Sequence, residues 1–321
     1  MVGVNIGDFF ADAPWAPDKI DGALGGARCT GYFDCDAVKF WHCDPARVIP
    51  TASKDTIKKV MVNVNNDEML TVNDWIGWVE SNLAPVVRAL RQCPVFKTIY
   101  LAVGNEPLAP WHVERFGKCL LPCLHHVVTA LRATALYDRV KVVTPLEMCI
   151  LSNSYPPSAS TVADQHMEVV KGVVQFCVKH GSPFCVNVYP FFARQHASKE
   201  FVLFGPDPGY EDQGLKYTDM FSAQYDAVVR AVSKLGIPGA DAMEVTVTET
   251  GWPTAESSMA DSGSARKFTA GIVRASVHGT PLRPGRMDIY LFELFDERHK
   301  TGERHEKHFG LFDFEGNPKR G

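Results

Sequence analysis

Eight short runs of apolar and β-branched residues recur along this chain, and segments with helical patterning lie between them. The runs occupy residues 2–5, 37–41, 59–64, 98–104, 140–144, 184–189, 244–249 and 287–292. The clearest helical segments, with apolar residues three and four positions apart, are 74–91, 111–136, 161–180 and 218–235, and 261–278 is predicted as a further helix. Strands and helices that alternate in this way predict an α/β fold of the (β/α)8 TIM-barrel type.

A doubly wound open sheet is the alternative arrangement for alternating strands and helices. That fold is expected to carry a glycine-rich phosphate turn after an early strand, but GxGxxG is absent, and Gly25 and Gly26 follow a helix-like segment. No repeat or linker divides the chain, so residues 1–321 are predicted to form one catalytic domain. The segment 190–217 is long for a strand-to-helix connection, and we expect a small subdomain there, inserted after strand 6.

Two residues refine the predicted helices. Thr218 is a suitable N-cap for the helix over 218–235. Pro85 lies inside the pattern at 74–91, where a residue without a backbone N–H is expected to kink or split the helix.

The overall composition excludes several classes of protein. With 45% hydrophobic residues, the chain is an ordinary globular sequence and not a disordered one. Its net charge of −4 provides no basic surface for nucleic acid or for an anionic membrane. No apolar run is long enough to span a bilayer. Met1 leads directly into the run 2–5, which is predicted as a strand and not as a secretory leader.

The cysteines leave the redox environment of the protein open. There are nine of them, an odd number, and no two form a CxxC pair. A group near the N-terminus has the composition for one disulfide: Cys29, Cys35 and Cys43. Three others lie in apolar segments and are predicted to be small core residues: Cys149, Cys177 and Cys185.

Two glutamates stand where apolar strands end. IYLAVGNEP at 99–107 leads into Glu106, and EVTVTETGWP at 244–253 carries Glu249. In a (β/α)8 barrel the catalytic groups come from the C-terminal ends of the strands, and strands 4 and 7 face one another across the mouth. Glycoside hydrolysis requires two opposed carboxyl groups, because one protonates the leaving oxygen while the other attacks the sugar carbon or activates water. Burial and mutual repulsion are expected to separate their pKa values.

Two other roles for these carboxylates are compatible with the sequence. Each glutamate alone could accept backbone N–H hydrogen bonds at a turn. Together they could bind a metal ion, but His125 and His126 are adjacent in a helix and face different directions, and no HExxH motif occurs. The position of both acids at the ends of opposed strands favours catalysis.

Six blocks of sequence show a resemblance to a known family. They are GVN at 3–5, VKFWHCDP at 38–45, AVGNE at 102–106, NVYPFF at 187–192, TETGWP at 248–253, and LFDERHKTG with EKHFGLF over 294–312. In this order, and over nearly the whole chain, they resemble glycoside hydrolase family 17, the β-1,3-glucanases and β-1,3-1,4-glucanases known best from plants. The resemblance implies a retaining (β/α)8 hydrolase, which agrees with the barrel predicted from the alternation of strands and helices.

The resemblance also implies roles for individual residues. Glu106 matches the family's general acid/base, Glu249 its nucleophile, and Asn105 an amide that contacts the substrate near the point of cleavage. Accessory positions of the family are matched by Glu297, Lys300 and Glu306. We expect the Lys300–Glu297 pair to keep the nucleophile ionised and positioned, and the alternative is an ordinary network of salt bridges in a loop. The resemblance implies no cofactor and no metal.

Aromatic side chains in the same blocks fit a sugar-binding cleft, because pyranose rings present flat C–H faces that stack on aromatic rings. The predicted substrate-binding residues are Trp41, Asn187, Tyr189, Phe191, Phe192 and Trp252. Of these, Phe192 could equally serve in packing. The other tryptophans are predicted as packing or surface residues: Trp15, Trp75, Trp78 and Trp111.

The chain departs from the plant members of the family at several positions. Residues 6–9 replace the usual Tyr-Gly after GVN, and Phe191 replaces a frequent tyrosine. Glu293 in strand 8 replaces a small residue and is expected to place a third acid near the mouth. The run 21–38, rich in Cys, Gly and Asp, is unlike the plant members. These departures leave the predicted catalytic pair intact and concern the sugar subsites.

The sequence therefore predicts a monomeric, retaining endo-β-1,3-glucanase that acts on laminarin-type β-1,3-glucan through two glutamates. A β-1,3-glucan transglucosylase is the alternative among enzymes, and a non-catalytic β-glucan-binding barrel is the alternative from another class. A polysaccharide or oligosaccharide is the expected partner, with no nucleic acid and no membrane span. We expect a protein that is secreted or associated with the cell wall, with its leader absent from this sequence, and a cytosolic protein is the alternative.

Overall fold

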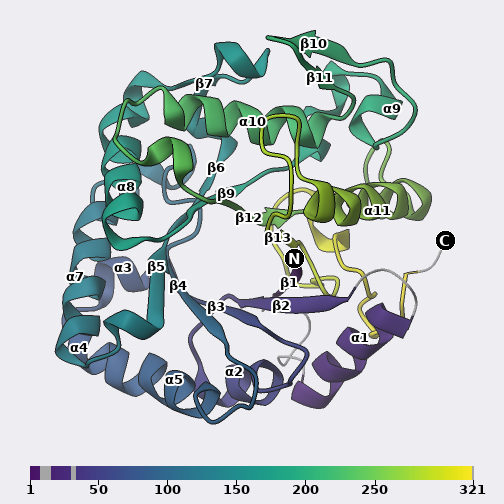
Figure 1. The fold of residues 1–321 in the computed structure, drawn as a ribbon. Helices are drawn as coiled ribbons and strands as arrows, with labels where there is room; N and C mark the ends of the chain where they lie inside the picture. Colours follow the sequence, from purple (N-terminus) through teal and green to yellow (C-terminus); the bar gives the residue numbers. More distant parts are fainter. Residues whose placement is uncertain (8–15, 30–33, 320–321) are drawn as a thin grey trace.

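A single parallel sheet forms the centre of the molecule (Figure 1). The computed structural model describes residues 1–7, 16–29 and 34–319 of the chain. The strands follow the order β5-β4-β3-β2-β1-β13-β12-β9-β6, and neighbouring strands are parallel. Their bounds are Val2–Ile6 (β1), Cys35–Phe40 (β2), Lys59–Val64 (β3), Thr98–Val103 (β4), Val140–Val143 (β5), Pro145–Glu147 (β6), Phe184–Asn187 (β9), Val245–Thr250 (β12) and Ile289–Leu291 (β13). Each predicted run corresponds to one of these strands, with β6 as an extension of the fifth.

The run 140–147 brings the two ends of the sheet together. Thr144 alone separates β5 from β6 in the chain. β5 pairs with β4, where Val140 lies opposite Ile99, and β6 pairs with β9, where Pro145 lies opposite Cys185. Because one continuous stretch of chain contacts both edges, the sheet curves into a barrel and leaves little edge exposed. The predicted (β/α)8 fold is confirmed.

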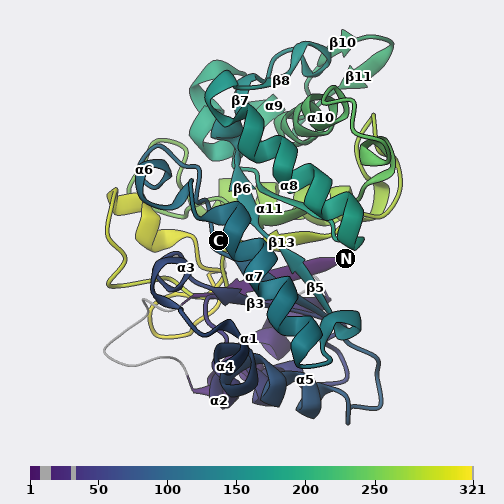
Figure 2. The same ribbon diagram turned by 90° about the vertical axis from the view of Figure 1, so that its left-hand side faces the viewer.

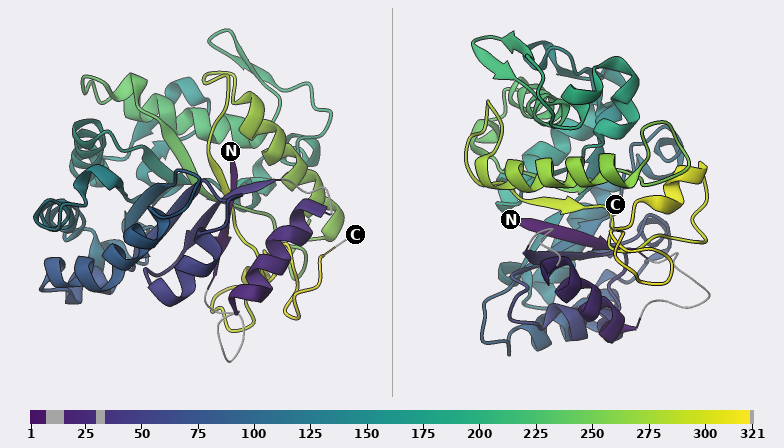
Figure 3. Two further views of the ribbon diagram at one scale, coloured as in Figure 1. Left: turned by 60° about the horizontal axis from the view of Figure 1, so that its bottom comes forward. Right: turned by 90° about the vertical axis from the view of Figure 1, so that its right-hand side faces the viewer.

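Helices surround the sheet on its outer side (Figures 1 and 3). The longer ones are Pro17–Cys29 (α1), Pro45–Ala52 (α2), Ala84–Leu90 (α5), Leu120–Ala133 (α7), Met167–His180 (α8), Met220–Ser233 (α10) and Ser262–His278 (α11). Single turns of helix are Glu68–Thr71 (α3), Trp75–Trp78 (α4), Val113–Phe116 (α6) and Lys199–Val202 (α9). Buried apolar residues of the helices and of the outward strand positions form one continuous core between the two layers.

The two local helix predictions have different outcomes. The helical pattern at 74–91 is divided, since a π-helical turn over Val79–Leu83 joins α4 to α5. Pro85 directly follows this π-helical turn, in the first turn of α5, so the helix changes its geometry next to the residue that lacks a backbone N–H. The predicted N-cap Thr218 is wrong: Asp219 caps α10, and its carboxylate accepts hydrogen bonds from the Ser222 backbone N–H at 2.7 Å and the Ser222 hydroxyl at 2.9 Å. The carboxylate accepts from two donors at once, which favours aspartate at this position.

Alternate residues of the strands point into the barrel. A compact inner cluster comprises Ala37, Met61, Tyr100, Ala102, Val143, Cys185 and Tyr290. Two residues further along several of these strands, the same face carries polar side chains, of which Lys39, Asn63 and Asn187 are buried. The barrel is therefore filled by apolar side chains in its middle and becomes polar toward the C-terminal ends of its strands, as expected for this fold.

Two excursions from the barrel pack against each other beside α10 (Figures 1 and 2). One is the hairpin of Leu151–Asn153 (β7) and Thr161–Val162 (β8); the other is the hairpin of Tyr210–Asp212 (β10) and Leu215–Tyr217 (β11). The Ser158 backbone N–H donates a hydrogen bond of 2.7 Å to Asp212, and the Tyr155 and Tyr210 rings lie 5.1 Å apart. The segment 190–217 thus has secondary structure of its own, and its status as a subdomain stays a prediction.

Some predictions concern residues whose side chains the structure does not describe. These are Trp15, residues 8 and 9, and Cys29, so the proposed disulfide near the N-terminus stays a prediction. Cys177 and Cys185 are buried, which confirms their prediction as core residues, while Cys149 is half-buried. Among the helices that the structure describes, none is long and apolar enough to cross a membrane.

Candidate active site

Polar side chains gather at the end of the barrel where the strands finish. They include Asn5, Lys39, Asn105, Glu106, Asn187 and Glu249. Figure 2 shows the barrel from the side, with α3, α6 and the C-terminal segment at this end. Because the strands are parallel, residues far apart in the sequence meet here, and the hydrogen bonds described below join them into one site.

Glu249 reaches this site through an irregularity in β12. Strict alternation would point Thr246 and Thr248 into the barrel and Glu249 toward the helices. The register of β12 against β9 shifts between Val247 and Glu249, and this shift places Glu249 opposite Asn187. A bulge of this kind turns a side chain to the other face of the strand. The alternating pattern of the sequence alone would have assigned Glu249 to the wrong face.

Both carboxylate oxygens of Glu249 have a partner. Its side chain is buried, Oε1 lies 2.6 Å from Lys39 Nζ, and Oε2 accepts a hydrogen bond of 3.0 Å from the Tyr189 hydroxyl. The ion pair with Lys39 compensates for the loss of water around the carboxylate. Glu249 is therefore held in one orientation as an anion.

Lys39 is the residue of this site that the sequence analysis missed. Its side chain is 0% exposed, and Nζ also donates a hydrogen bond of 3.2 Å to Asn105 Oδ1. The Nζ atom lies 4.7 Å from the centre of the Trp41 ring. The available signal was a lysine within the buried strand sequence AVKFW, since lysine is almost never fully buried unless it is paired.

Glu106 has a different set of partners. It is half-buried at the end of β4, with a positive φ of 50°, and Oε1 accepts a hydrogen bond of 2.9 Å from Asn187 Nδ2. Burial, and secondly the charge of Glu249, raise the pKa of Glu106 to about 8, although Asn187 and Lys39 oppose the shift. Glu106 is therefore the protonated member of the pair at neutral pH.

Asparagine side chains fix the two carboxylates relative to the barrel. Asn187 Oδ1 accepts a hydrogen bond of 2.7 Å from the Thr248 hydroxyl, so the amide that contacts Glu106 is oriented by the residue before Glu249. Asn5 donates from one amide nitrogen to the Thr248 and Leu291 carbonyls at 3.2 and 3.1 Å. These contacts connect β1, β9, β12 and β13 beneath the two acids.

Lys300 lies between two neighbouring acids, and the lysine that pairs directly with Glu249 is Lys39. Its Nζ lies 3.5 Å from Glu297 and 3.5 Å from Glu306, and 4.0 Å from the centre of the Phe292 ring. Lys39 makes the direct contact with Glu249, but the charge of Glu249 also acts on Lys300. The expectation that Lys300 and Glu297 keep the nucleophile ionised and positioned therefore stays a prediction.

Glu293, expected as a third acid near the mouth, is fully buried. Burial raises the pKa of its carboxyl group well above its ordinary value, and Glu297 adds to the shift. Both carboxyl groups lie against Gly7, where a Cβ atom would collide with Glu297 Oε1 and Glu293 Oε2. Glycine at position 7 therefore provides the space that this additional acid occupies.

The structure divides the predicted aromatic residues into two groups. Phe191 and Trp252 are buried against each other with ring centres 5.1 Å apart, and the Trp252 indole donates a hydrogen bond of 2.8 Å to the Met259 carbonyl. They pack beneath the surface and do not offer a ring face to a sugar, contrary to our expectation. Phe192, by contrast, is 48% exposed, and its ring centre lies 5.5 Å from that of Tyr189.

Trp41 and Tyr189 are half-buried: Tyr189 donates a hydrogen bond to Glu249, and Trp41 lies against Lys39, the partner of Glu249. Their rings lie 6.2 and 6.3 Å from the ring of Phe292, in edge-to-face arrangements. These two rings are the aromatic groups that contact Glu249 or its lysine.

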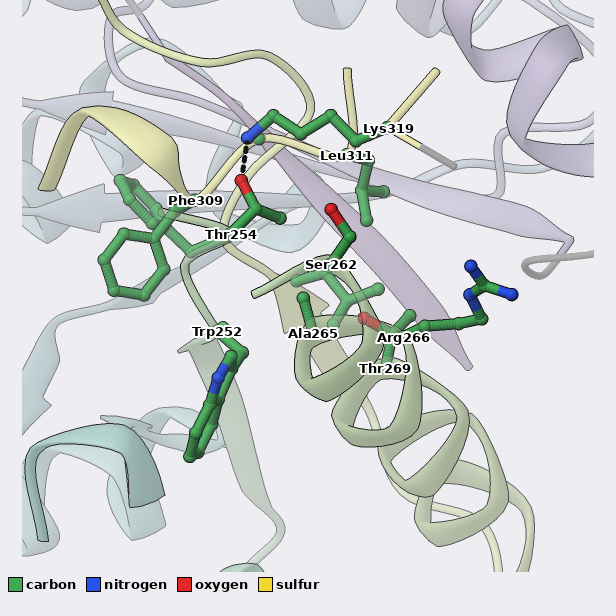
Figure 4. A pocket seen from close by; sticks show the side chains of 13 residues that line it. Trp252, Thr254, Ser262, Ala265, Arg266, Thr269, Phe309, Leu311 and Lys319 are labelled. Carbon is green, nitrogen blue, oxygen red and sulfur yellow. Dashed lines mark hydrogen bonds between the residues drawn. The ribbon is translucent and has the colours of Figure 1, made fainter. Parts of the chain in front are cut away.

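A small crevice behind Phe292 and Phe309, next to Trp252 and Lys319, has a volume of about 20 Å³ (Figure 4). It has room for about one water molecule and not for a sugar.

A further acid lies near Glu106 on the neighbouring strand. Glu147 ends β6, is 8% exposed, and accepts a hydrogen bond from the Cys149 thiol. Burial raises the pKa of Glu147, and its charge contributes to the raised pKa of Glu106. Within the part of the chain that the structure describes, no three His, Cys, Asp or Glu side chains are arranged to hold a metal ion.

Comparisons with known proteins found a matching family model and several related proteins. The family model of glycosyl hydrolases family 17 matches residues 33–320. Glucan endo-1,3-beta-glucosidase 7 of Arabidopsis thaliana is 35% identical over 97% of this chain and 61% of its own length, so the chain spans less than two thirds of that relative. Glucan endo-1,3-beta-D-glucosidase of Olea europaea is 34% identical over 98% of this chain and 68% of its own length.

A solved structure is similar over nearly its whole length. The β-1,3-glucanase and allergen of Cryptomeria japonica pollen has a TM-score of 0.87 and 31% sequence identity, and the match covers 99% of this chain and 97% of that one. The overall fold is therefore shared with that protein over nearly the whole of both chains.

Proposed function

The chain belongs to glycosyl hydrolases family 17, and we propose that it is a retaining endo-β-1,3-glucanase that cleaves laminarin-type β-1,3-glucan with Glu249 as nucleophile and Glu106 as acid/base. The observation that supports this most directly is the difference between the two carboxyl groups. Glu249 is paired with Lys39 at 2.6 Å, whereas the pKa of Glu106 is raised to about 8. One site thus holds a carboxylate and a carboxylic acid at neutral pH, as a double displacement requires.

The first half of the reaction uses these two states together. Glu249 attacks the anomeric carbon while Glu106 donates its proton to the glycosidic oxygen, so the C–O bond to the leaving chain breaks and a glucosyl ester forms on Glu249. Lys39 and Tyr189 hold the attacking carboxylate in place before the substrate arrives. Both partners stay with the carboxylate, so little reorganisation is needed at the moment of attack.

The second half reverses the roles. Glu106, now ionised, accepts a proton from water as the water oxygen attacks the anomeric carbon, and Glu249 leaves as a carboxylate. Asn187 donates to Glu106 Oε1 and is placed to stabilise this ionised form. The configuration at the anomeric carbon is retained because two inversions occur in sequence.

The decisive experiment is a timed product analysis on a soluble linear β-1,3-glucan. We expect oligosaccharides of many lengths early in the reaction, and β-configured products in the first minutes by NMR. Glu249→Ala should abolish turnover with an unchanged circular dichroism spectrum, while Glu114→Ala, which removes an exposed glutamate in α6, should be fully active. Normal turnover by Glu249→Ala, or products of inverted configuration, would refute the proposal.

A second experiment separates the two roles. Glu106→Ala should be nearly inactive on the polymer but should still form the covalent intermediate from a substrate with an activated aryl leaving group, because that group leaves without protonation. Added azide should then restore turnover and yield a β-glucosyl azide. An α-glucosyl azide from Glu106→Ala would mean that the two roles are exchanged.

A further inference from the structure

Trp111 stands out at the active-site end of the barrel, because it is the most exposed tryptophan among the residues that the structure describes. Its side chain is 70% exposed, whereas Trp75 and Trp252 are buried and Trp41 and Trp78 are half-buried. A single exposed aromatic residue is common on a protein surface, so the position of Trp111 relative to Glu106 is what matters for its role. It precedes α6, which lies at the same end of the barrel as α3 and the C-terminal segment (Figure 2).

Trp111 is joined to Glu106 through two consecutive turns. The backbone N–H of Ala109 donates to the Glu106 carbonyl at 3.1 Å, and the N–H of His112 donates to the Ala109 carbonyl at 2.8 Å. Each turn brings its first and last Cα atoms within about 7 Å. The Trp111 backbone is therefore within about 14 Å of that of Glu106, a span of a few sugar units.

The same segment is held rigidly. Pro107 and Pro110 fix two backbone φ angles, and Leu108 and Ala109 between them are 1% and 0% exposed. A ring nitrogen of His112 lies 3.1 Å from the Glu106 carbonyl oxygen, and the Trp111 and His112 rings meet edge to face at 6.1 Å. An exposed ring on such a support loses little freedom when a ligand stacks on it.

A third contact links this segment to the catalytic dipeptide. Asn66, which follows β3, donates from Nδ2 to the Asn105 carbonyl at 2.8 Å and accepts from the Asn105 N–H at 2.9 Å. The same Nδ2 lies 3.4 Å from the His112 ring nitrogen. These contacts hold the backbone next to Trp111 in a fixed position relative to Glu106, the residue that protonates the glycosidic oxygen.

We propose that Trp111 is a stacking platform for a glucose ring of the leaving-group side of the glucan chain. The inference rests on the function proposed above. The side chains around Glu249, namely Lys39, Tyr189 and Trp41, enclose the sugar that the nucleophile attacks. Glu106 gives its proton to the oxygen of the departing chain, and Trp111 extends outward from the turns that follow Glu106.

A platform on the leaving-group side has a chemical consequence. After the leaving chain has departed, a second glucan chain that binds on Trp111 can present its hydroxyl group to the glucosyl ester. The hydroxyl oxygen then forms a bond to the anomeric carbon, its proton goes to Glu106, and Glu249 is released as a carboxylate. Transfer to sugar thus competes with transfer to water, and Trp111 should raise the share of transfer.

Phe96 provides a matched control within the same chain. It is also an exposed aromatic residue, 81% exposed, but it precedes β4, at the opposite end of the barrel from Glu106. Loss of a ring that contacts no substrate should leave the kinetics unchanged. Trp111→Phe supplies the conservative variant, which keeps a ring for stacking.

The test compares two substrates that share the same glycone. One is a linear β-1,3-gluco-oligosaccharide extended on the leaving-group side, and the other carries a single aryl leaving group too short to reach Trp111. For Trp111→Ala we expect kcat/KM on the extended substrate to fall about five- to tenfold and the transfer-to-hydrolysis product ratio to fall as well. On the aryl substrate, kcat/KM of Trp111→Ala should be close to that of the wild type. Trp111→Phe and Phe96→Ala should have kcat/KM values close to the wild-type values on both substrates.

The outcomes separate this inference from the proposed function. If the wild type cleaves β-1,3-glucan and Trp111→Ala matches it on the extended substrate, Trp111 is not a platform and the inference alone fails. An equal loss on both substrates would place Trp111 on the nucleophile side and would also overturn it. If the wild type cleaves no β-1,3-glucan, the proposed function fails, and the inference fails with it.

Discussion

At the scale of single residues, the site separates two chemically identical side chains by their neighbours. Glu249 has a lysine and a tyrosine hydroxyl as partners, and Glu106 has an amide donor and lies near two other acids. Positive charge favours the ionised form, whereas burial beside negative charge favours the protonated form. The division of roles therefore follows from the charges of the contacts around each carboxyl group.

The pKa of Glu106 predicts the basic limb of the pH profile. Glu106 acts as an acid in its protonated form. We therefore expect kcat/KM to be constant just below about pH 8 and to fall above it. Asn187 lowers this pKa by its hydrogen bond to the ionised form. Asn187→Ala should therefore move the basic limb upward by about one pH unit. A profile of kcat/KM between pH 5 and pH 10 measures the shift, and an unmoved limb would exclude this role for Asn187.

Lys39 gives a prediction at the other carboxylate. Lys39→Met leaves the buried Glu249 without its positive partner, so we expect kcat/KM to fall about 100-fold at neutral pH. Lys39→Arg keeps the charge and should retain more activity than Lys39→Met. Equal activity of the two variants would show that charge is not what Lys39 supplies.

At the scale of elements, hydrogen-bonding geometry decided positions that sequence pattern could not. The periodicity located α10 correctly, yet the residue that caps it lies one position beyond the predicted Thr218. Both residues are common N-caps, and the choice depends on which side chain reaches the free backbone N–H groups of the first turn. In β12 the register shift likewise moved Glu249 to the face opposite to the one that alternation predicts.

The cap of α10 can be tested directly. Asp219→Ala removes the acceptor of two hydrogen bonds from Ser222 and should lower the free energy of unfolding by about 1 kcal/mol. Thr218→Ala is the matched control and should change it by no more than about 0.5 kcal/mol, since Thr218 is exposed and does not cap the helix. Chemical denaturation measures both. If Thr218→Ala lowers the free energy of unfolding more than Asp219→Ala does, then Thr218 caps the helix, as the sequence predicted.

At the scale of the whole molecule, the C-terminal segment secures the mouth of the barrel. Lys319 donates a hydrogen bond of 2.7 Å to Thr254 (Figure 4). It also reaches the His308 carbonyl at 3.1 Å and pairs with Asp296, which is 2% exposed. The Gly310 backbone N–H also donates to Asp296 at 2.9 Å. The last residues of the described chain thus join the segments that follow β12 and β13.

This arrangement predicts a large stability effect from one residue near the end of the chain. Lys319→Met leaves the buried Asp296 with the His308 ring, 3.5 Å away, as its remaining basic neighbour, and should lower the free energy of unfolding by about 3 kcal/mol. The control is Arg298→Ala, which removes a pair with Glu315 whose side chains are 55% and 62% exposed, and should cost less than about 1 kcal/mol. Thermal and denaturant unfolding check both variants. Similar losses for the two would mean that burial does not distinguish these pairs.

The sequence by itself determined the barrel, its strands, and the position of both glutamates at strand ends. These features depend on local periodicity and on topology, which one chain displays directly. The tertiary structure alone decided three others: that Lys39 contacts Glu249, that Phe191 and Trp252 are buried while Phe192 is exposed, and that Trp111 is presented beside Glu106. Each depends on contacts between residues distant in the chain or on which side of a turn a side chain points, and neither property repeats with a period that a sequence can show.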